Sequence, residues 1–288
     1  MITAREIAAW RGVAPWSSDL QVEQDYLLSK SVAAIFEDRF LAGEVTMRGG
    51  TVLHKGHLAP ASRYSEDIDL VHVGNHPAAH IKKALARVLT PILGKPSESV
   101  FTTITLAVRN LAMKSRIIRS TYLYDPSSST GALAELKIEV NVNETQSLYP
   151  LVPITIDVPR EEGGTRALAV RSYDLDEMLG TKMRALLQRE HGRDLFDLWW
   201  AWEYSKSLPV PTVNPARVGA AFRFYMDREG SPFSADNYRH ELARRMQSPK
   251  FLRDMDGYLP VGRMYDPHLA HRAFIKVFLP HIDASRRT

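Results

Sequence analysis

The most regular pattern in the sequence is an alternating run from Leu133 to Asn143. Apolar residues occupy every second position and polar residues stand between them: the apolar set is Leu136, Ile138, Val140 and Val142, and the polar set is Lys137, Glu139, Asn141 and Asn143. Successive side chains of a β-strand point to opposite faces, so this run predicts a strand with one buried face and one polar face. We therefore expect this strand to carry the Glu139 carboxylate on its polar face.

Neighbouring segments supply further strands and the helices that cover them. Strands are expected at Val45 to Met47, Asp67 to Val73, Phe101 to Val108, Leu111 to Tyr124 and Ile154 to Val158, and amphipathic helices at Val22 to Phe40 and Ala78 to Leu93. The polar, glycine-containing stretch from Pro159 to Arg166 ends this pattern, and the periodicity after it is helical. We expect an α/β (α+β) chain with two lobes, a sheet-containing lobe of residues 1–166 and a mainly helical lobe of residues 167–288.

Composition narrows the kinds of site that this chain can hold. It has no cysteine, which excludes disulfides and thiolate metal sites and points to a reducing, cytoplasmic setting. Neither a signal-peptide pattern nor an uncharged run long enough to cross a membrane is found. The first 170 residues hold 18 basic and 18 acidic side chains, whereas the remainder holds 19 and 15. This C-terminal surplus favours an anionic partner such as nucleic acid, although many basic domains have none.

Asp67 and Asp69 form the first candidate for chemistry. Separated by one residue on an expected strand, they point to the same side and could hold one or two divalent metal ions. Mg²⁺, or Mn²⁺, prefers such hard oxygen ligands and neutralises the polyphosphate of a nucleotide during group transfer. Alone, an Asp-x-Asp pair is common and unspecific.

The segment before these aspartates sharpens the reading. Gly49 and Gly50 follow a short strand, where backbone amides could approach phosphate oxygens closely, and the Thr51 hydroxyl could add a donor. The glycine pair could equally be an ordinary turn. Arg63, four residues before Asp67, could pair with the carboxylates or contact a phosphate, or it could be a surface arginine.

Glu139 is the third carboxylate that we select. It lies on the polar face of the alternating strand and so could come beside Asp67 and Asp69, as a metal ligand or as the general base for an attacking hydroxyl. The competing interpretation is a solvated strand face on which Glu139 pairs with Lys137.

Lys182 stands out in the second lobe. It falls within the apolar stripe of a helix expected from Ser172 to Glu190, where an unpaired ammonium would be costly to bury, so it should face a cleft or an acid. A snorkelling side chain is the alternative. Gly192 is expected to end this helix, and Asp194 and Asp197 could be an N-cap and an i,i+4 partner of Arg193 in the next one.

Basic and aromatic residues also gather on the strand expected from Leu111 to Tyr124. Lys114, Arg116 and Arg119 could contact an RNA backbone, with Tyr122 and Tyr124 stacking on bases. The charged solvent face of an edge strand would explain them as well.

Taken together, four segments resemble those of the AbiEii/AbiGii-type nucleotidyltransferase toxins, a family that includes the mycobacterial MenT toxins and belongs to the polymerase-beta-like nucleotidyltransferase superfamily. The segments are Gln21 to Asp38, which opens Q-V-E-Q-D-Y-L-L, Arg48 to Leu53 (R-G-G-T-V-L), Arg63 to Leu70 (R-Y-S-E-D-I-D-L) and Lys182 to Leu198 (K-M-R-A-L-L-Q-R-E-H-G-R-D-L-F-D-L). They occur in this order over roughly the first 200 residues. The last part of the chain shows no motif that we can place.

The resemblance implies a fold, a set of roles and a function. It implies an N-terminal nucleotidyltransferase lobe with a mixed sheet and a helical C-terminal lobe closing a cleft. The implied roles are phosphate binding by Gly50 and Thr51, metal binding by Asp67 and Asp69, nucleotide binding by Lys182 and an active-site carboxylate at Asp194. Family members are toxins of toxin–antitoxin pairs, usually encoded beside a winged-helix antitoxin, and several add nucleotides to the 3′ end of tRNA.

The expected function is therefore Mg²⁺-dependent transfer of a nucleotide from a nucleoside triphosphate to an RNA 3′ end, in a tRNA above all, which blocks aminoacylation and growth. Two alternatives stay open. The first is transfer to a protein or small-molecule hydroxyl. The second is a regulator that binds GTP or ATP without turnover.

Overall fold

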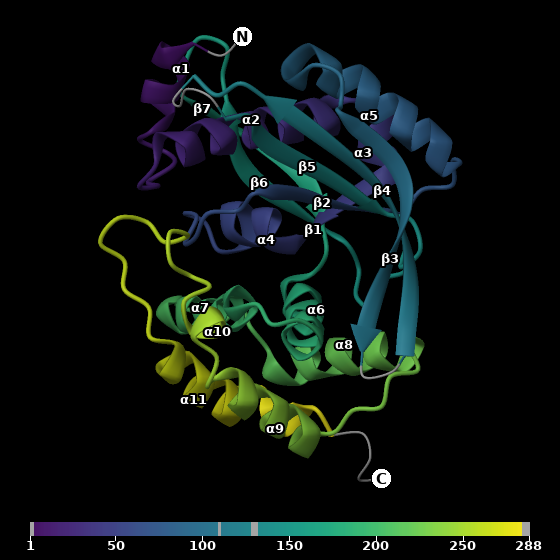
Figure 1. The fold of residues 1–288 in the computed structure, drawn as a ribbon, viewed down its shortest axis with the longest axis vertical. Helices are drawn as coiled ribbons and strands as arrows, with labels where there is room; N and C mark the ends of the chain where they lie inside the picture. Colours follow the sequence, from purple (N-terminus) through teal and green to yellow (C-terminus); the bar gives the residue numbers. More distant parts are fainter. Residues whose placement is uncertain (1–2, 109–110, 128–131, 284–288) are drawn as a thin grey trace.

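The computed structural model describes residues 3–108, 111–127 and 132–283, and side chains are not considered from 101 to 116. A twisted sheet lies above a group of helices built by the C-terminal part of the chain (Figure 1). Further helices cover the opposite, upper face of the sheet (Figure 1). The architecture confirms the expected α/β class.

Seven strands form one mixed sheet in the order β3-β4-β5-β2-β1-β7-β6. They are β1 (Val45–Arg48), β2 (Asp67–His72), β3 (Glu98–Val108), β4 (Leu111–Tyr124), β5 (Ala134–Asn141), β6 (Val152–Pro159) and β7 (Thr165–Ser172). The central strand β2 pairs antiparallel with β1 and parallel with β5, and β1 also runs parallel to β7. The apolar side chains of the alternating run are buried, as the pattern predicted: Leu136, Ile138 and Val140 are at most 1% exposed.

The strand β7 was not expected. Its sequence, T-R-A-L-A-V-R-S, has few large apolar residues, and its pairing with β1 and β6 compensates for the weak pattern. The expected division of the chain after Arg166 falls within this strand, and the sheet continues to Ser172. That division remains a prediction, because one hydrophobic core extends from the sheet into the C-terminal helices.

The upper face of the sheet is covered mainly by α2 (Asp19–Glu37) and α5 (Ala78–Leu93), with α1 (Ala4–Trp10) at one side (Figure 1). The helix expected as far as Phe40 ends at Glu37, because Asp38 has an extended backbone and caps a separate short helix, α3 (Arg39–Glu44). Its Oδ1 accepts a hydrogen bond from the Leu41 amide at 3.0 Å.

The lower face carries α4 (Gly49–Val52), which follows β1 directly, and the wide π-helical turn η1 (Leu53–His57). The C-terminal helices are α6 (Leu175–Gln188), α7 (Gly192–Ser207), α8 (Pro215–Arg228), α9 (Ala235–Arg245), α10 (Pro249–Leu252) and α11 (Pro267–Val277), followed by a final turn η2 (Leu279–His281). In the described part of the chain, no helix is long and apolar enough to cross a membrane.

Gly192 begins α7 and does not end α6, contrary to expectation. The reason is tertiary. A Cβ at this position would stand 2.1 Å from the Phe251 carbonyl oxygen, so the residue is small because α7 packs against the chain near α10.

Candidate active site

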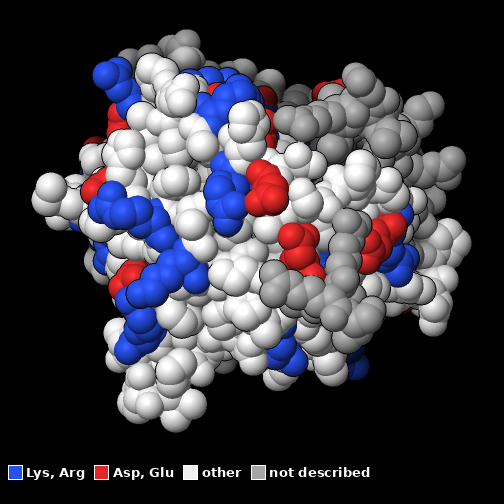
Figure 2. All heavy atoms as spheres, turned by 90° about the horizontal axis from the view of Figure 1, so that it is seen from below, with Lys and Arg blue, Asp and Glu red and all other residues white. Residues whose placement is uncertain are grey.

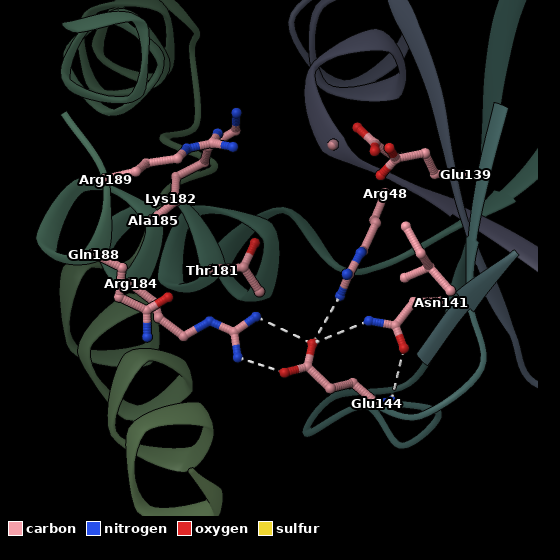
Figure 3. Close-up of a pocket in the computed structure, with 13 residues that line it drawn as sticks. Arg48, Glu139, Asn141, Glu144, Thr181, Lys182, Arg184, Ala185, Gln188 and Arg189 are labelled. Carbon is pink, nitrogen blue, oxygen red and sulfur yellow. Dashed lines mark hydrogen bonds and ion pairs between the residues drawn. The ribbon is translucent and has the colours of Figure 1, made fainter. Parts of the chain in front are cut away.

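A cleft of about 260 Å³ opens between the lower face of the sheet and α6 (Figure 3). The sheet side, with the loop after β5, contributes Arg48, Gly49, Asp69, Ile117, Glu139, Asn141 and Glu144, and α6 and the residue after it contribute Thr181, Lys182, Arg184, Ala185, Gln188 and Arg189. Carboxylates therefore face cations across this cleft. Such a division of charge suits a ligand that brings both a polyphosphate and a metal ion.

Strand register aligns four charged residues in a row across the sheet. Arg48 is paired with Asp69, Asp69 with Glu139, and Glu139 with Arg119. Glu139 thus lies beside Asp69, as its position on the polar face of the strand predicted. The Arg119 Nε donates to Glu139 Oε1 at 2.7 Å, so the partner of this carboxylate is Arg119 and not the Lys137 of the alternative interpretation.

Gly49 and Gly50 are required by close approach. Gly49 has a φ of +81°, and a Cβ there would stand 2.0 Å from Asp69 Oδ2. At Gly50 a Cβ would stand 2.8 Å from Nη2 of Arg63 and 3.0 Å from Ser65 Oγ. The glycine pair therefore lets the chain after β1 pass directly over the start of β2.

The Thr51 hydroxyl has a structural partner. It is fully buried and donates to the Asp67 carbonyl oxygen at 2.6 Å, with Ser65 Oγ 2.9 Å away. This bond fixes the backbone from which Asp67 and Asp69 project. Its hydrogen therefore serves the backbone, and the expected contact of the Thr51 hydroxyl with phosphate stays a prediction.

Asp67 is half-buried on the same side of β2 as Asp69. Burial, followed by the negative charges of Asp69, Glu66 and Glu139, raises the pKa of its carboxyl to about 7, although Lys137 opposes the shift. Excess negative charge of this kind is relieved by a bound cation.

These carboxylates could bind a metal ion either alone or together with the phosphates of a substrate. No group of three or more His, Asp or Glu side chains is preassembled to hold a metal ion among residues 3–108, 111–127 and 132–283. Mg²⁺ usually needs only one or two carboxylates, because substrate phosphates and water complete its coordination. Asp67 and Asp69 fit that role, whereas Glu139 would first have to leave Arg119.

Lys182 faces both a cleft and acids. Its side chain is 10% exposed, and Nζ lies 3.1 Å from Asp194 Oδ1 and 2.7 Å from Asp197 Oδ2. Asp194 is buried and also accepts two hydrogen bonds from Arg189, at 2.7 and 2.9 Å. Burial alone would raise the pKa of Asp194, but Arg189 and Lys182 outweigh it and lower that pKa to about 2. Asp194 is thus an ionised anchor for two cleft cations and not an N-cap, since His191 occupies that position.

Arg63 lies behind Gly50 and is buried. Its Nε and Nη2 form a fork on the Asp197 carboxylate at 2.6 and 2.8 Å. His54 Nε2 lies 2.8 Å from the same carboxylate, and burial lowers the pKa of this histidine to about 4, so it is neutral at pH 7. Arg63 is therefore not among the residues that line the cleft, and its expected contact with a phosphate stays a prediction.

Asp197 joins the sheet-containing part of the chain to the C-terminal helices. It binds Arg63 and His54, which lie between β1 and β2, and Lys182 of α6, and not Arg193 as expected from helical spacing. Sequence reasoning missed this role because the partners are distant in the chain.

Two further cleft residues, Glu144 and Arg184, were also not singled out. If the alternation continued, Glu144 would fall on the apolar face with Val140 and Val142. It does not, because β5 ends at Asn141 and a turn follows. Arg184 looks like a solvent-facing helix arginine, yet its side chain is only 9% exposed and is bound by Glu144 and Glu229.

Of the β4 side chains that were expected to contact RNA, Arg119 binds Glu139. Lys114 and Arg116 lie outside the side chains described. Tyr122 is 1% exposed and so cannot stack on a base. The edge-strand explanation also fails, because β4 lies between β3 and β5.

Comparisons with known proteins agree on one group. Residues 31–274 match a family model described as the nucleotidyl transferase AbiEii toxin of a type IV toxin–antitoxin system. A solved structure of MenT4, a nucleotidyltransferase toxin from Mycobacterium tuberculosis, is similar in fold, with a TM-score of 0.57 and 13% sequence identity over 100% of this chain and 92% of that one. No curated protein sequence matches.

Proposed function

The chain belongs to the AbiEii family of nucleotidyltransferase toxins, and on that premise we propose that it transfers a nucleotide from a nucleoside triphosphate to the 3′ end of an RNA, with tRNA as the expected acceptor. Family membership makes it a nucleotidyltransferase of a toxin–antitoxin system, with a nucleoside triphosphate as substrate and an antitoxin as partner. It also argues against the alternative of a regulator without turnover.

One observation carries the proposal. Asp69 and Glu139 on the sheet face Lys182 and Arg189 of the helical lobe across a single cleft. Figure 3 shows Lys182 and Arg189 on one wall and Glu139 and Arg48 on the other. A triphosphate held between such walls would have the side-chain cations along its oxygens, and the carboxylates would hold a divalent ion that neutralises its charge.

We assign the following roles. Asp67 and Asp69 would hold Mg²⁺ or Mn²⁺, with Glu139 as a third ligand or as the base for the attacking hydroxyl. The cation would supply charge neutralisation to the phosphates. Lys182, oriented by Asp194 and Asp197, would hold a non-bridging phosphate oxygen with the N–H that the aspartates leave to the cleft.

In the reaction the 3′-oxygen of the acceptor bonds to the α-phosphorus, and the bond from that phosphorus to the β-bridging oxygen breaks. The hydroxyl proton goes to the base and pyrophosphate leaves. Gly49 and Gly50 contribute by bringing the backbone against the carboxylates, whereas Thr51 and Arg63 act from behind the site through Asp67 and Asp197.

An RNA acceptor is supported by charge. Exposed basic side chains of α9 and α11 include Arg239, Arg244, Arg272 and Lys276. Figure 2 shows this underside of the molecule, where Lys and Arg gather in the left half. Such a surface attracts a polyanion to the protein, through an interaction that salt screens. Modification of the tRNA 3′ end would block aminoacylation and growth in the cytoplasm, and a winged-helix antitoxin would counter it.

The test is transfer of each labelled nucleoside triphosphate to total tRNA in Mg²⁺, comparing the wild type with Asp69→Ala. We expect labelled tRNA with the wild type and none with the variant. A parallel panel of protein and small hydroxyl acceptors separates the remaining alternative, since label there and not on RNA would move the activity to that class. Equal labelling of RNA by both forms would refute the site.

A further inference from the structure

Glu144 bridges two arginines of the cleft. Its Oε1 accepts from Arg184 Nη1 at 2.6 Å, and its Oε2 accepts from Arg184 Nη2 at 3.1 Å and from Arg48 Nη1 at 3.2 Å. Arg48 belongs to the sheet and Arg184 to α6, so this one carboxylate ties the two walls together. Figure 3 shows it lying between them at one end of the cleft.

The backbone holds Glu144 in this place. Asn141 Oδ1 accepts hydrogen bonds from the amides of Asn143 and Glu144, each at 2.8 Å, which turns the chain just after β5. The Glu144 side chain is 19% exposed and lines the cleft. It is therefore positioned by a turn and is still within reach of a ligand.

The two carboxylates that bind Arg184, those of Glu144 and Glu229, differ in burial. Glu229 is 3% exposed, accepts from Arg184 Nη1 at 2.5 Å and is held further by Gln188 Nε2 at 2.6 Å. Glu144 stands on the cleft side. If its carboxylate moved away, Arg184 would keep Glu229, and the freed N–H groups of Arg184 and Arg48 would face the cleft. Such an arginine pair is costly to leave unpaired, so another anion must take the place of the carboxylate.

A phosphate group meets that requirement. Arginine binds carboxylate and phosphate oxygens with the same two-pronged geometry. Arg48 extends from beside the acidic row to Glu144 (Figure 3). Glu139 and Asn141 are two residues apart on a strand, roughly 6.6 Å, and Asn141 Nδ2 lies 3.5 Å from Glu144 Oε2. A chain of linked phosphates that begins at Asp69 and Glu139 can therefore end at the two arginines.

We propose that Glu144 occupies the subsite of the terminal phosphates of the substrate, and that a triphosphate binds by displacing this carboxylate from Arg48 and Arg184. The proposal rests on the proposed nucleotidyl transfer and extends it. Glu144 would act as a specificity residue, because a ligand must carry enough negative charge beyond the α-phosphate to compete with it. Nucleoside monophosphates would leave Glu144 in place.

The Glu144 carboxylate, which competes with the phosphates, is ionised at neutral pH. Burial would raise the pKa of Glu144, but Arg184 and Arg48 outweigh it and lower that pKa to about 2. The apparent affinity is then the intrinsic affinity multiplied by the fraction of molecules in which the carboxylate has moved away, so a carboxylate that rarely moves weakens binding.

The experiment measures binding of inorganic tripolyphosphate by calorimetry without divalent metal and without RNA. Glu144→Gln keeps the shape of the side chain and removes its charge, so we expect the Kd to fall about tenfold. Glu135→Gln is the matched control, because it makes the same charge change on β5, the strand that precedes Glu144, at a side chain that is 42% exposed and outside the cleft. Its Kd should stay within about twofold of the wild type, since exposed charges act weakly.

Two further variants protect the test. Glu144→Asp keeps the charge but is too short to bridge both arginines, so it should also bind tripolyphosphate more tightly, and it provides the answer if the Gln variant does not fold. In Arg48→Ala/Glu144→Gln the gain should shrink to below about threefold, because one of the two cations is gone.

Tighter binding in both Glu144 variants and not in the control supports the proposal. Unchanged or weaker binding would overturn it, since Glu144 would then only hold the arginines in position. The result is independent of transfer: a chain that labels no RNA but shows this pattern loses the proposed acceptor and keeps the phosphate subsite. A chain that labels RNA without this pattern keeps its activity and loses the role of Glu144.

Discussion

Gly49 lies so close to the Asp69 carboxylate that a Cβ added to it would stand 2.0 Å from Oδ2. The backbone after β1 therefore sets where this carboxylate points. The R-G-G-T segment and the D-I-D segment form one unit, and the glycine is needed by contact as well as by its φ of +81°.

Gly49→Ala should therefore reduce transfer more than it reduces stability. The methyl group must push the Asp69 carboxylate away, and we expect transfer to fall by at least about a hundredfold, as displacement of a reacting group by ~1 Å does. Gly164→Ala is the control: its φ of +78° carries the same backbone strain, but nothing lies within 4 Å of the added atom. Both variants should lose roughly 1–3 kcal/mol of unfolding free energy. Equal transfer by the two would mean that the contact has no catalytic consequence.

Lys182 offers a second separation of activity from stability. Lys182→Met removes the ammonium, but Asp194 keeps Arg189 and Asp197 keeps Arg63, so the buried aspartates remain paired. We expect transfer to fall on the order of a hundredfold, with a modest loss of unfolding free energy. Lys55→Met is a matched control, because Lys55 is also 10% exposed and bound to a buried aspartate, Asp25, away from the cleft. If both variants lose transfer alike, Lys182 does not act on the substrate.

Substitution of Arg63, in contrast, should lower the unfolding free energy, because this residue stabilises the fold. Arg63→Ala removes the two-pronged partner of a completely buried Asp197, and breaking such a pair costs about 3–5 kcal/mol. Arg63→Lys should recover only part of that, since an ammonium cannot replace the fork. Urea unfolding measures both. Arg239→Ala, which removes an exposed ion pair with Asp236, should cost below about 1 kcal/mol; a similar cost for Arg63→Ala would contradict its structural role.

The contrast between Lys182 and Arg63 shows where prediction from sequence succeeds. Local periodicity identified the strand that carries Glu139, the aspartates one residue apart, and a lysine out of place on an apolar stripe. Each of these depends on neighbours within a few positions. Arg63 and Asp197 bind each other although they are 134 residues apart in the sequence, and Glu144 and Arg184 are 40 residues apart. No local pattern records such contacts, because they arise only when the sheet and the C-terminal helices pack together.

The same limit explains β7 and Gly192. The short side chains of β7 suffice because β1 and β6 supply its hydrogen bonds. Gly192 resembles a helix stop because its sequence signal is the same as that of a residue pressed against a distant carbonyl. Tertiary contact overrides local preference in both.

Asp67 gives the last prediction, on pH. Its pKa is about 7 in the folded protein and 3.8 for the free side chain, so the folded state holds the proton more tightly than the unfolded state does. The resulting stability is fully present below about pH 4 and is lost as the pH rises through 7.

Carboxylates with lowered pKa values, such as Glu44, act in the opposite direction and only as the pH falls from about 4.5 towards 2. Buried histidines such as His54, whose pKa is lowered to about 4, add stability as the pH rises towards 6.5, so the prediction concerns the difference between the two proteins. We expect the unfolding free energy of Asp67→Asn to rise relative to that of the wild type between pH 5 and pH 8, and at pH 8 without metal to be about 1–2 kcal/mol higher. Mg²⁺ should remove this difference by stabilising the ionised wild-type pair and not the variant. Parallel urea titrations of both proteins at the two pH values, with and without Mg²⁺, measure the effect, and identical curves throughout would show that Asp67 is neither crowded by its neighbours nor a partner of the cation.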